Sequence, residues 1–411
     1  MNILLISYFH RSESSIGSVR TRAMEKYFPG YGIDVFFLSA EAQKNNIKYL
    51  EKGITIRDRG QVTLPKSLEQ GVKGLMKISR ILGLYITPRS SWRDLTITEG
   101  KGIIKYTKPD AILASFPPIE ALEIGIKFSE CYNIPLITDF RDGLLYDAGE
   151  CDGLLNSAIM KYHRLIEEEV ARVSKVIITV SDPITEYFHQ KYNLNNVLTM
   201  PNGYEQDCYI NCPEVALDAN RINIVHTGRL GMSEKGRDSG ILCKAIELAE
   251  KKHPRLKEKL IFHFVGELSS TEENTLGHLA KIGLAKLWGH QPRNIALAIQ
   301  KSSDILMLIT APDKASVATG KIFEYLASEK PILALTRGTE AEKIIKETGA
   351  GIAISPDDAI EIANALTIIA RDGELKIPGR NDGVISTYQR GKQMKILAQK
   401  IRNNLNNLSS H

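Results

Sequence analysis

The chain has 411 residues, of which 43% are hydrophobic and 25% are charged. This length predicts two or three domains, and the composition excludes a disordered or collagen-like protein. The net charge of +5 is small for such a length, so it gives no reason to expect a nucleic-acid partner. The five cysteines are scattered and lack zinc-finger spacing, which excludes a disulfide framework and fits a reducing compartment.

The first residues, MNILLISYFHR, favour a buried strand over a secretion signal, because their apolar run is short and no basic region precedes it. No other window approaches the apolar length of a membrane-spanning helix. These features predict a cytoplasmic protein.

Short apolar runs alternate with helix-length segments along the whole chain, which predicts α/β layers built on parallel sheets. The runs are continuous rather than alternating, as expected for strands that helices cover on both faces. Ten strands are predicted, at 2–7, 33–38, 110–114, 134–138, 175–180, 222–227, 260–265, 304–309, 331–335 and 350–354. Helices are predicted at 19–28, 161–172, 238–252, 293–302, 358–370 and 384–404.

Two sets of about five strands favour two doubly wound domains over one very wide sheet. The boundary is expected near 203–221, where Gly, Pro, Asn and Asp interrupt the pattern. The stretch 71–86 differs from the rest of the chain. Its apolar residues recur with a helical period, and the polar face of that helix would contain Lys and Arg but no acidic residue. It is either an ordinary core helix with a solvated basic face or a contact with an anionic membrane surface or a lipid-linked acceptor.

Several familiar motifs are absent from the sequence. There is no P-loop, no GxGxxG after the first strand, no HExxH, no GxSxG and no Asp-x-Asp pair. A nucleotide diphosphate held by a metal ion usually needs closely spaced carboxylates. If the protein binds such a ligand, cations and helix ends must therefore meet its charge.

The second half offers candidates for this task. Strand 222–227 ends at Gly228, Arg229 follows at once, and Lys235 comes six residues later in a glycine-bearing loop. Ligands of parallel α/β sheets bind at the carboxyl ends of strands, where Arg and Lys can meet an anion. Ordinary surface charges are the alternative interpretation of this loop.

A helix beginning near Thr319 offers a second group of candidates. Thr319 is a plausible N-cap, and Gly320 and Lys321 would form the first turn, where free N–H groups favour an anion. Glu324, one turn later, could reach a polyol such as ribose, or could simply stabilise the helix start. The KLWGHQP segment, 286–292, predicts a short strand and a turn whose exposed backbone could contact a base edge.

In the first half, three loops follow strand ends and should face one cleft. The first contains Gly17, the second is SFPP at 115–118, and the third is DFRD, with Asp139 and Asp142. The DFRD run is either a closed salt-bridge cluster or a group that orders the acceptor side of a site.

Four motifs follow one another in the second half: GRLG…EKG, VGE at 265–267, a WGH turn and GKIFEYLASEKPIL. Their order resembles the donor domain of glycosyltransferase family 4. PNGYEQD at 201–207 resembles the segment near that family's interdomain linker, and the Gly17 loop and the PP…DFRD run resemble its acceptor domain. The resemblance covers nearly the whole chain.

This resemblance implies the GT-B fold, with two Rossmann-like domains facing a central cleft. Residues 1–205 would bind the acceptor, 218–383 would bind the nucleotide-sugar donor, and a C-terminal helix within 384–411 would pack back on the first domain. The implied activity is metal-independent transfer of a hexose with retention of configuration. The donor would be a nucleotide diphosphate sugar, with UDP favoured, and no cofactor is implied.

The resemblance also assigns roles to individual residues. Arg229 and Lys235 would hold the diphosphate, with help from Gly228 and the backbone of Gly320 and Lys321. Glu324 would bind the ribose, and the turn at 287–290, which includes His290, would hold the base. Gly17 would approach the sugar or phosphate, and Asp139 and Asp142 would order the acceptor. The family often has another glutamate before this one, with seven residues between the two, and this chain has Ser316 at that position. Ser316 or a neighbouring backbone N–H would then contact the donor sugar.

The resulting hypothesis is a bacterial glycosyltransferase of surface-polysaccharide assembly, acting on a glycan or lipid-linked glycan at the inner face of the membrane. Two alternatives remain open. One is a non-catalytic nucleotide-sugar-binding protein, which the serine at 316 motivates, and the other is a GT-B epimerase or phosphorylase.

Overall fold

The computed structural model describes residues 1–12, 16–41, 45–58, 87, 89–147, 154–230, 239–310, 315–316 and 318–406. The basic stretch 71–86 and the loop with Lys235 lie outside these residues, so their predicted roles stay predictions. The chain forms two compact units: unit 1 comprises Met1–Pro201 and Gly391–His411, and unit 2 comprises Asn202–Arg390.

Unit 1 contains an eight-stranded sheet in the order β3-β4-β2-β1-β5-β6-β7-β8. All neighbouring strands are parallel except β3 and β4, which are antiparallel. The strands are β1 (Asn2–Ile6), β2 (Asp34–Glu41), β3 (Ile47–Leu50), β4 (Gly53–Arg57), β5 (Ala111–Phe116), β6 (Leu136–Phe140), β7 (Ser174–Thr179) and β8 (Val197–Thr199). The helices are α1 (Ile16–Tyr27), η1 (Phe28–Tyr31), α3 (Ser90–Thr98), α4 (Gly100–Thr107), α5 (Ile119–Tyr132), α6 (Leu154–Val173), α7 (Asp182–Tyr192) and α16 (Arg390–Asn406).

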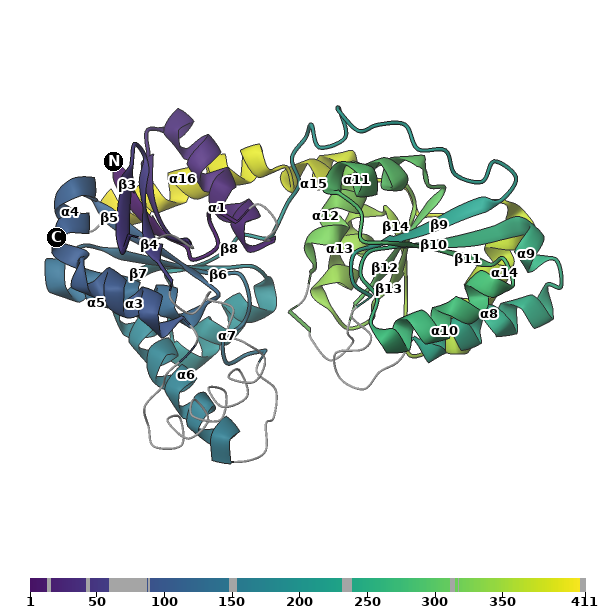
Figure 1. Ribbon diagram of the computed structural model, residues 1–411, viewed down its shortest axis with the longest axis horizontal. Helices are drawn as coiled ribbons and strands as arrows, with labels where there is room; N and C mark the ends of the chain where they lie inside the picture. The colour runs from purple at the N-terminus through teal and green to yellow at the C-terminus, as the bar shows by residue number, and fades with distance from the viewer. Residues whose placement is uncertain are drawn as a thin grey trace. The chain divides into compact units, whose positions relative to one another are not determined.

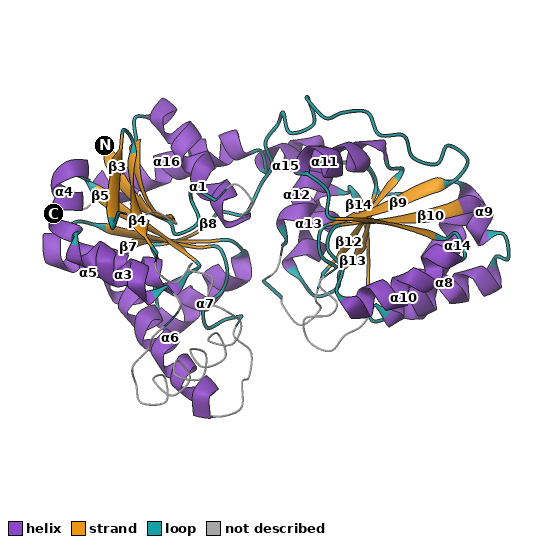
Figure 2. Ribbon diagram, in the orientation of Figure 1, coloured by secondary structure: helices purple, strands orange, loops and turns teal. Residues whose placement is uncertain are grey.

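Helices cover both faces of this sheet (Figures 1 and 2). On one face, α3, α4, α5, α6 and α7 pack into a core that includes Trp92 and Phe128. On the other face, α1 and η1 share a core with α16, through residues such as Met24 and Leu397. Every residue of β5 is buried, because helices exclude water from both of its sides.

Unit 2 contains a six-stranded, fully parallel sheet in the order β11-β10-β9-β12-β13-β14. The strands are β9 (Ile222–Thr227), β10 (Leu260–Val265), β11 (Ala285–Gly289), β12 (Ile305–Ile309), β13 (Ile332–Leu335) and β14 (Gly351–Ile354). The helices are α8 (Gly240–Lys252), α9 (Leu256–Lys259), α10 (Ser270–Lys281), α11 (Arg293–Ser302), α12 (Gly320–Ala327), α13 (Glu340–Thr348), α14 (Ala359–Asp372) and α15 (Asp382–Thr387).

This sheet is also covered on both faces (Figure 2). Helices α8, α10 and α14 bury one face, with Leu242, Leu276 and Leu366 in the core. Helices α11, α12 and α13 bury the other, with Phe323 and Ile344. Both units are therefore doubly wound α/β layers, which confirms the predicted fold class.

All ten strands predicted by range are present, and the short strand predicted within 286–292 is β11, but no range was predicted for β3, β4 or β8. The edge strand β3 contains the exposed residues Lys48 and Tyr49, so it lacks the continuous apolar run that marks a buried strand. The predicted helix 384–404 is wrong in its extent, because the structure has two helices there. They are separated at Tyr388 and Gln389, whose backbone pairs with Tyr204. No helix in the described part of the chain is long and apolar enough to cross a membrane.

Candidate functional site

The candidate site of unit 2 lies where three neighbouring strands end. After β9, the amide of Gly228 donates to the carbonyl of Val265 at 2.6 Å. After β10, the amide of Gly266 donates to the carbonyl of Gly289 in β11 at 2.8 Å. Strand pairing thus continues past β9 and β10 and fixes the backbone at the carboxyl edge, where ligands of parallel sheets bind.

Two glycines allow these chain ends to approach closely. Gly228 has φ +82°, and a Cβ there would lie 2.8 Å from Cε of Lys321. Gly266 has φ +147°, and a Cβ there would lie 2.8 Å from the carbonyl carbon of Gly228. A side chain at Gly266 would therefore displace the neighbouring backbone, and one at Gly228 would displace the end of the Lys321 side chain.

The amino end of α12 points its unused hydrogen-bond donors at this edge. Thr319 is its N-cap, and no acidic side chain occupies the first turn. Within the described part of the chain, Thr319 Oγ1 is buried without a hydrogen-bond partner. Buried hydroxyls are normally paired, and free N–H groups at a helix start attract anions, so this end of α12 fits a phosphate group.

Lys321 adds a cation to the same place. Its Nζ donates to the carbonyl of Arg229 and lies 3.4 Å from Nε2 of His226. Nδ1 of His226 donates to the carbonyl of Met307 at 2.9 Å, so Nε2 of the neutral ring accepts from Lys321. Burial first, and the Lys321 charge second, lower the pKa of His226 to about 3. Burial lowers the pKa of Lys321 to about 8.

Glu324 lies one turn further along α12 and is partly exposed. Its Oε1 is 2.6 Å from Nη1 of Arg293, the first residue of α11. The ion pair links the helix that carries Glu324 to the segment that follows the 287–290 turn. Ser316, by contrast, is buried at 2% exposure, so the position of the missing glutamate does not present a side chain to solvent.

Arg229 and His290 flank the same strand ends. Arg229 is 76% exposed and lies 3.3 Å from Glu267, and such an exposed pair contributes little to stability, which leaves the guanidinium available to a ligand. His290 lines a pocket of about 300 Å³ together with Gly266, Glu267, Leu287 and Gly289. The pocket therefore lies at the turn predicted to hold a base.

A buried hydrogen-bond network holds the strand and helices that carry the site residues. The Tyr325 hydroxyl accepts from the amide of Thr227 at 3.0 Å, and Nε2 of Gln300 donates to Thr227 Oγ1 at 2.8 Å. Tyr209 donates to Oε1 of Gln300 at 2.5 Å. The network joins β9, α11, α12 and the 203–212 segment, and it fixes Thr227, the residue before Gly228.

Replacing Tyr325 with phenylalanine should destabilise the protein by about 1–3 kcal/mol, because the buried amide of Thr227 would lose its partner. Urea denaturation measures this free energy of unfolding. Tyr106→Phe is the control, because the Tyr106 hydroxyl donates to a carbonyl at the surface, where water can replace it. Equal stabilities for wild type and Tyr325→Phe would contradict the role assigned to the network.

The predicted site residues of unit 1 lie around the ends of β5 and β6. Asp139 is fully buried, 2.9 Å from Nη2 of Arg20, and accepts from Ser115 at 2.9 Å. Arg20 also donates to the carbonyl of Met200 at 2.6 Å. Asp139 is thus the centre of a closed ion pair that anchors α1 to the chain after β8.

Two further residues of unit 1 lie nearer to solvent. Arg141 donates to the carbonyls of Gly17, Phe116 and Pro117, so the DFRD segment holds the start of α1 and the SFPP segment together. Asp142 is exposed. Gly17 lies in the first turn of α1 and not in the predicted loop, because the helix begins at Ile16. The structure nevertheless brings together the three segments that were expected to meet at one sheet edge.

In unit 2 the structure gathers Gly228, Arg229, Thr319, Gly320, Lys321 and Glu324 at one sheet edge, with His290 at the adjoining pocket. The sequence pattern gave no sign that His226, Arg293, Gln300 and Tyr325 contribute, and it indicated Gly266 only as part of the VGE motif. His226 and Tyr325 stand in apolar runs that indicate core, and only their contacts reveal polar roles. Among the described residues, no three His, Cys, Asp or Glu side chains gather as metal ligands would.

Comparisons with known proteins agree with this architecture. Residues 221–372 match the family described as glycosyl transferases group 1. No curated protein matches the chain. The structure is similar to Anabaena HepE in complex with UDP, at TM-score 0.59 and 14% identity, over 100% of both chains.

Trehalose-phosphate synthases have similar structures. An E. coli structure bound with UDP-2-fluoro glucose has TM-score 0.61 and 13% identity, over 100% of this chain and 98% of that one. A Burkholderia xenovorans enzyme, a UDP-forming synthase in complex with glucose-6-phosphate, has TM-score 0.65 and 10% identity, over 98% and 99%. Residues 221–372 thus match a glycosyl transferases group 1 domain, and the chain has the GT-B fold of the similar glycosyltransferase structures.

Proposed function

We propose that the enzyme is a metal-independent, retaining hexosyltransferase that uses a nucleotide diphosphate sugar, with UDP as the favoured nucleotide. The observation that carries the proposal is the start of α12, where the unpaired Thr319 hydroxyl, two backbone amides and Lys321 converge. The complexes of HepE with UDP and with UDP-glucose support the choice of nucleotide. The order of the sequence motifs favours family 4.

The diphosphate, the ribose and the base of the donor each have a counterpart in unit 2. The diphosphate would lie at the start of α12, between Lys321 and Arg229, and Lys235 would join it from a loop outside the described residues. Glu324 would accept hydrogen bonds from the ribose hydroxyls, with Arg293 holding its other side. The base would enter the pocket at Gly289 and His290.

In the proposed reaction the bond between the anomeric carbon and the diphosphate oxygen breaks, and the acceptor oxygen bonds to the same carbon on the face that the leaving group vacates. The acceptor proton passes to a phosphate oxygen of the leaving nucleotide. Arg229, Lys321 and the α12 amides stabilise the negative charge that grows on this diphosphate. Such fixed cations and dipoles do the work that a metal ion performs elsewhere.

The acceptor is proposed to be a glycan or a lipid-linked glycan, and unit 1 is proposed to bind it. Asp142, at the end of β6, and Gly17 are the described residues nearest to this role. Contact with the inner face of the membrane through 71–86, a cytoplasmic location and a part in bacterial surface-polysaccharide assembly stay predictions from the sequence.

A thermal-shift screen with UDP, GDP, ADP and their common sugars tests the donor site. A ligand that binds only the folded protein at a hundredfold excess over Kd stabilises it by about 2.7 kcal/mol. We expect a shift with UDP and UDP-sugars that a chelator leaves unchanged and that Arg229→Ala reduces.

The other outcomes of this screen are equally informative. No shift with any nucleotide would overturn the proposal, and a shift that needs divalent metal would overturn the metal-independent site. Binding without UDP release in the presence of any acceptor would favour the non-catalytic alternative.

A further inference from the structure

Strand β11 contains one extra residue close to its carboxyl end. Leu287 pairs with Phe264 and Gly289 pairs with Val265, so Trp288 has no partner residue on β10. An extra residue of this kind is a β-bulge, which turns a side chain in a new direction and is frequent beside active sites. The bulge lies directly before the turn that lines the pocket.

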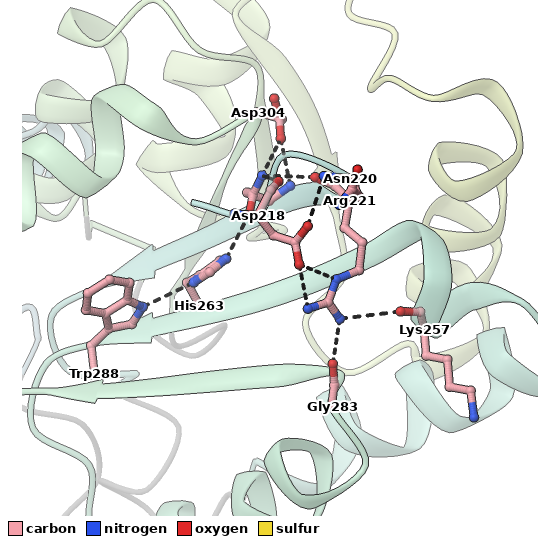
Figure 3. Close-up of polar contacts among 9 residues, drawn as sticks. Asp218, Asn220, Arg221, Lys257, His263, Gly283, Trp288 and Asp304 are labelled. Atoms are coloured by element: carbon pink, nitrogen blue, oxygen red, sulfur yellow. Dashed lines mark hydrogen bonds and ion pairs between the residues drawn. The ribbon is translucent and has the colours of Figure 1, made fainter. Parts of the chain in front are cut away.

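The bulged Trp288 is held by a histidine from the neighbouring strand (Figure 3). Its indole Nε1 donates to Nδ1 of His263 at 3.1 Å. His263 is buried, with 2% of its surface exposed. A tryptophan nitrogen can only donate, so this bond requires a neutral His263 with its proton on Nε2.

The surroundings of His263 favour that same tautomer. Nε2 of His263 lies 3.0 Å from Oδ1 of Asn223, which also accepts from the amide of Asp218 at 3.1 Å. The other end of the Asn223 amide donates to Oδ2 of Asp304 at 3.0 Å. Because Asn223 presents an acceptor, His263 must donate from Nε2 and accept from Trp288 at Nδ1.

The same network also holds the beginning of β11. Arg221 is paired with Asp218 at 2.8 Å and donates to the carbonyl of Gly283 at 2.7 Å, two residues before β11 (Figure 3). An edge strand has pairing on one side only, so side-chain contacts matter more for its position. Arg221 at one end and His263 near the other therefore fix β11 against β10.

We propose that His263 is a positioning residue for base recognition, which holds the bulged Trp288 and thereby the 287–290 turn in its ligand-binding conformation. The inference rests on the proposed function, because it assumes that the pocket at Gly289 and His290 receives the base. His263 itself does not line that pocket. It acts through Trp288, whose neighbours Leu287 and Gly289 do.

The test uses His263→Leu, which removes the acceptor, and Trp288→Phe, which removes the donor but keeps an aromatic ring. Each should raise the Kd for UDP, measured by calorimetry, at least tenfold, and should raise KM for the donor more than it changes kcat. The double variant should bind UDP as well as the single variant with the higher Kd, because the two substitutions remove the same hydrogen bond. His263→Gln, which keeps an acceptor and a donor, should restore part of the affinity.

A spectroscopic measurement separates positioning from general damage. The chain has two tryptophans, so Trp92→Phe leaves the indole N–H resonance of Trp288 alone in an NMR spectrum. In that background His263→Leu should move this resonance, whereas His278→Leu, at an exposed position of α10, should not. If the Trp288 resonance and the Kd for UDP are both unchanged in His263→Leu, the inference is overturned.

The design also distinguishes this inference from the proposed function. No nucleotide binding by the wild-type enzyme would overturn both together. Wild-type binding of UDP, with the same Kd in folded His263→Leu and Trp288→Phe, would overturn this inference alone.

Discussion

Replacing Lys321 with methionine is expected to lower turnover by an amount that corresponds to about 2–4 kcal/mol of activation free energy, as for the loss of one oxyanion donor. Methionine keeps the length and apolar packing of the lysine stem but removes the ammonium group beside Gly228 and the Arg229 carbonyl. Among the described residues, this ammonium group is the cation nearest to the start of α12. Steady-state release of UDP from a UDP-sugar measures the effect.

The pH dependence of binding gives an independent check on Lys321. Its pKa is lowered to about 8, so the ammonium loses its proton as pH rises through that value. The diphosphate keeps its charge over this range, because its last pKa is near 6. We expect the affinity of the wild-type enzyme for UDP to fall from about pH 8 upward, and Lys321→Met to lack this fall.

Lys301→Met provides the matched control, because it removes the same charge from an exposed position near the end of α11. It should leave turnover and the pH dependence unchanged. Wild-type activity in Lys321→Met would contradict the assignment of the diphosphate to the start of α12.

Introducing alanine at Gly266 is expected to reduce the free energy of unfolding by at least about 2 kcal/mol, since strained backbone and overpacking each cost about 1–3 kcal/mol. The new Cβ would lie 2.8 Å from both the carbonyl carbon and the oxygen of Gly228. Gly228 has little room to retreat, because its amide is bonded to Val265. UDP binding should weaken as well, since the residue after Gly228, Arg229, holds Lys321 through its carbonyl.

Gly379→Ala is the control variant, because it introduces similar backbone strain without a steric overlap between the new Cβ and a neighbouring atom. Gly379 has φ +129°, comparable with Gly266, but a Cβ at this position would meet no atom within 4 Å. It should be less destabilising than Gly266→Ala and should leave the Kd for UDP unchanged. Urea denaturation and calorimetry on both variants measure these differences, and equal losses of stability would contradict the close approach of β9 and β10.

The sequence alone determined the α/β class and most of the strand positions. Continuous apolar runs such as 260–265 mark strands buried on both faces, and this signal is local, so it needs no knowledge of the fold. The same local signals located the candidate anion-binding segments at 228–229 and 319–321. The edge strand β3 gave no such signal, because its two central residues, Lys48 and Tyr49, are both exposed and interrupt any apolar run.

Tertiary structure alone decided which polar side chains support the site. His226 and Tyr325 stand in apolar runs, and their roles depend on Lys321 and Thr227, which lie about 95 residues away along the chain. Asp139 had two sequence interpretations, and only its bond to Arg20 places it in a buried ion pair. Hydrogen bonds and ion pairs between distant segments depend on atomic distances that no local pattern encodes, so the sequence could name the candidate residues but not their partners.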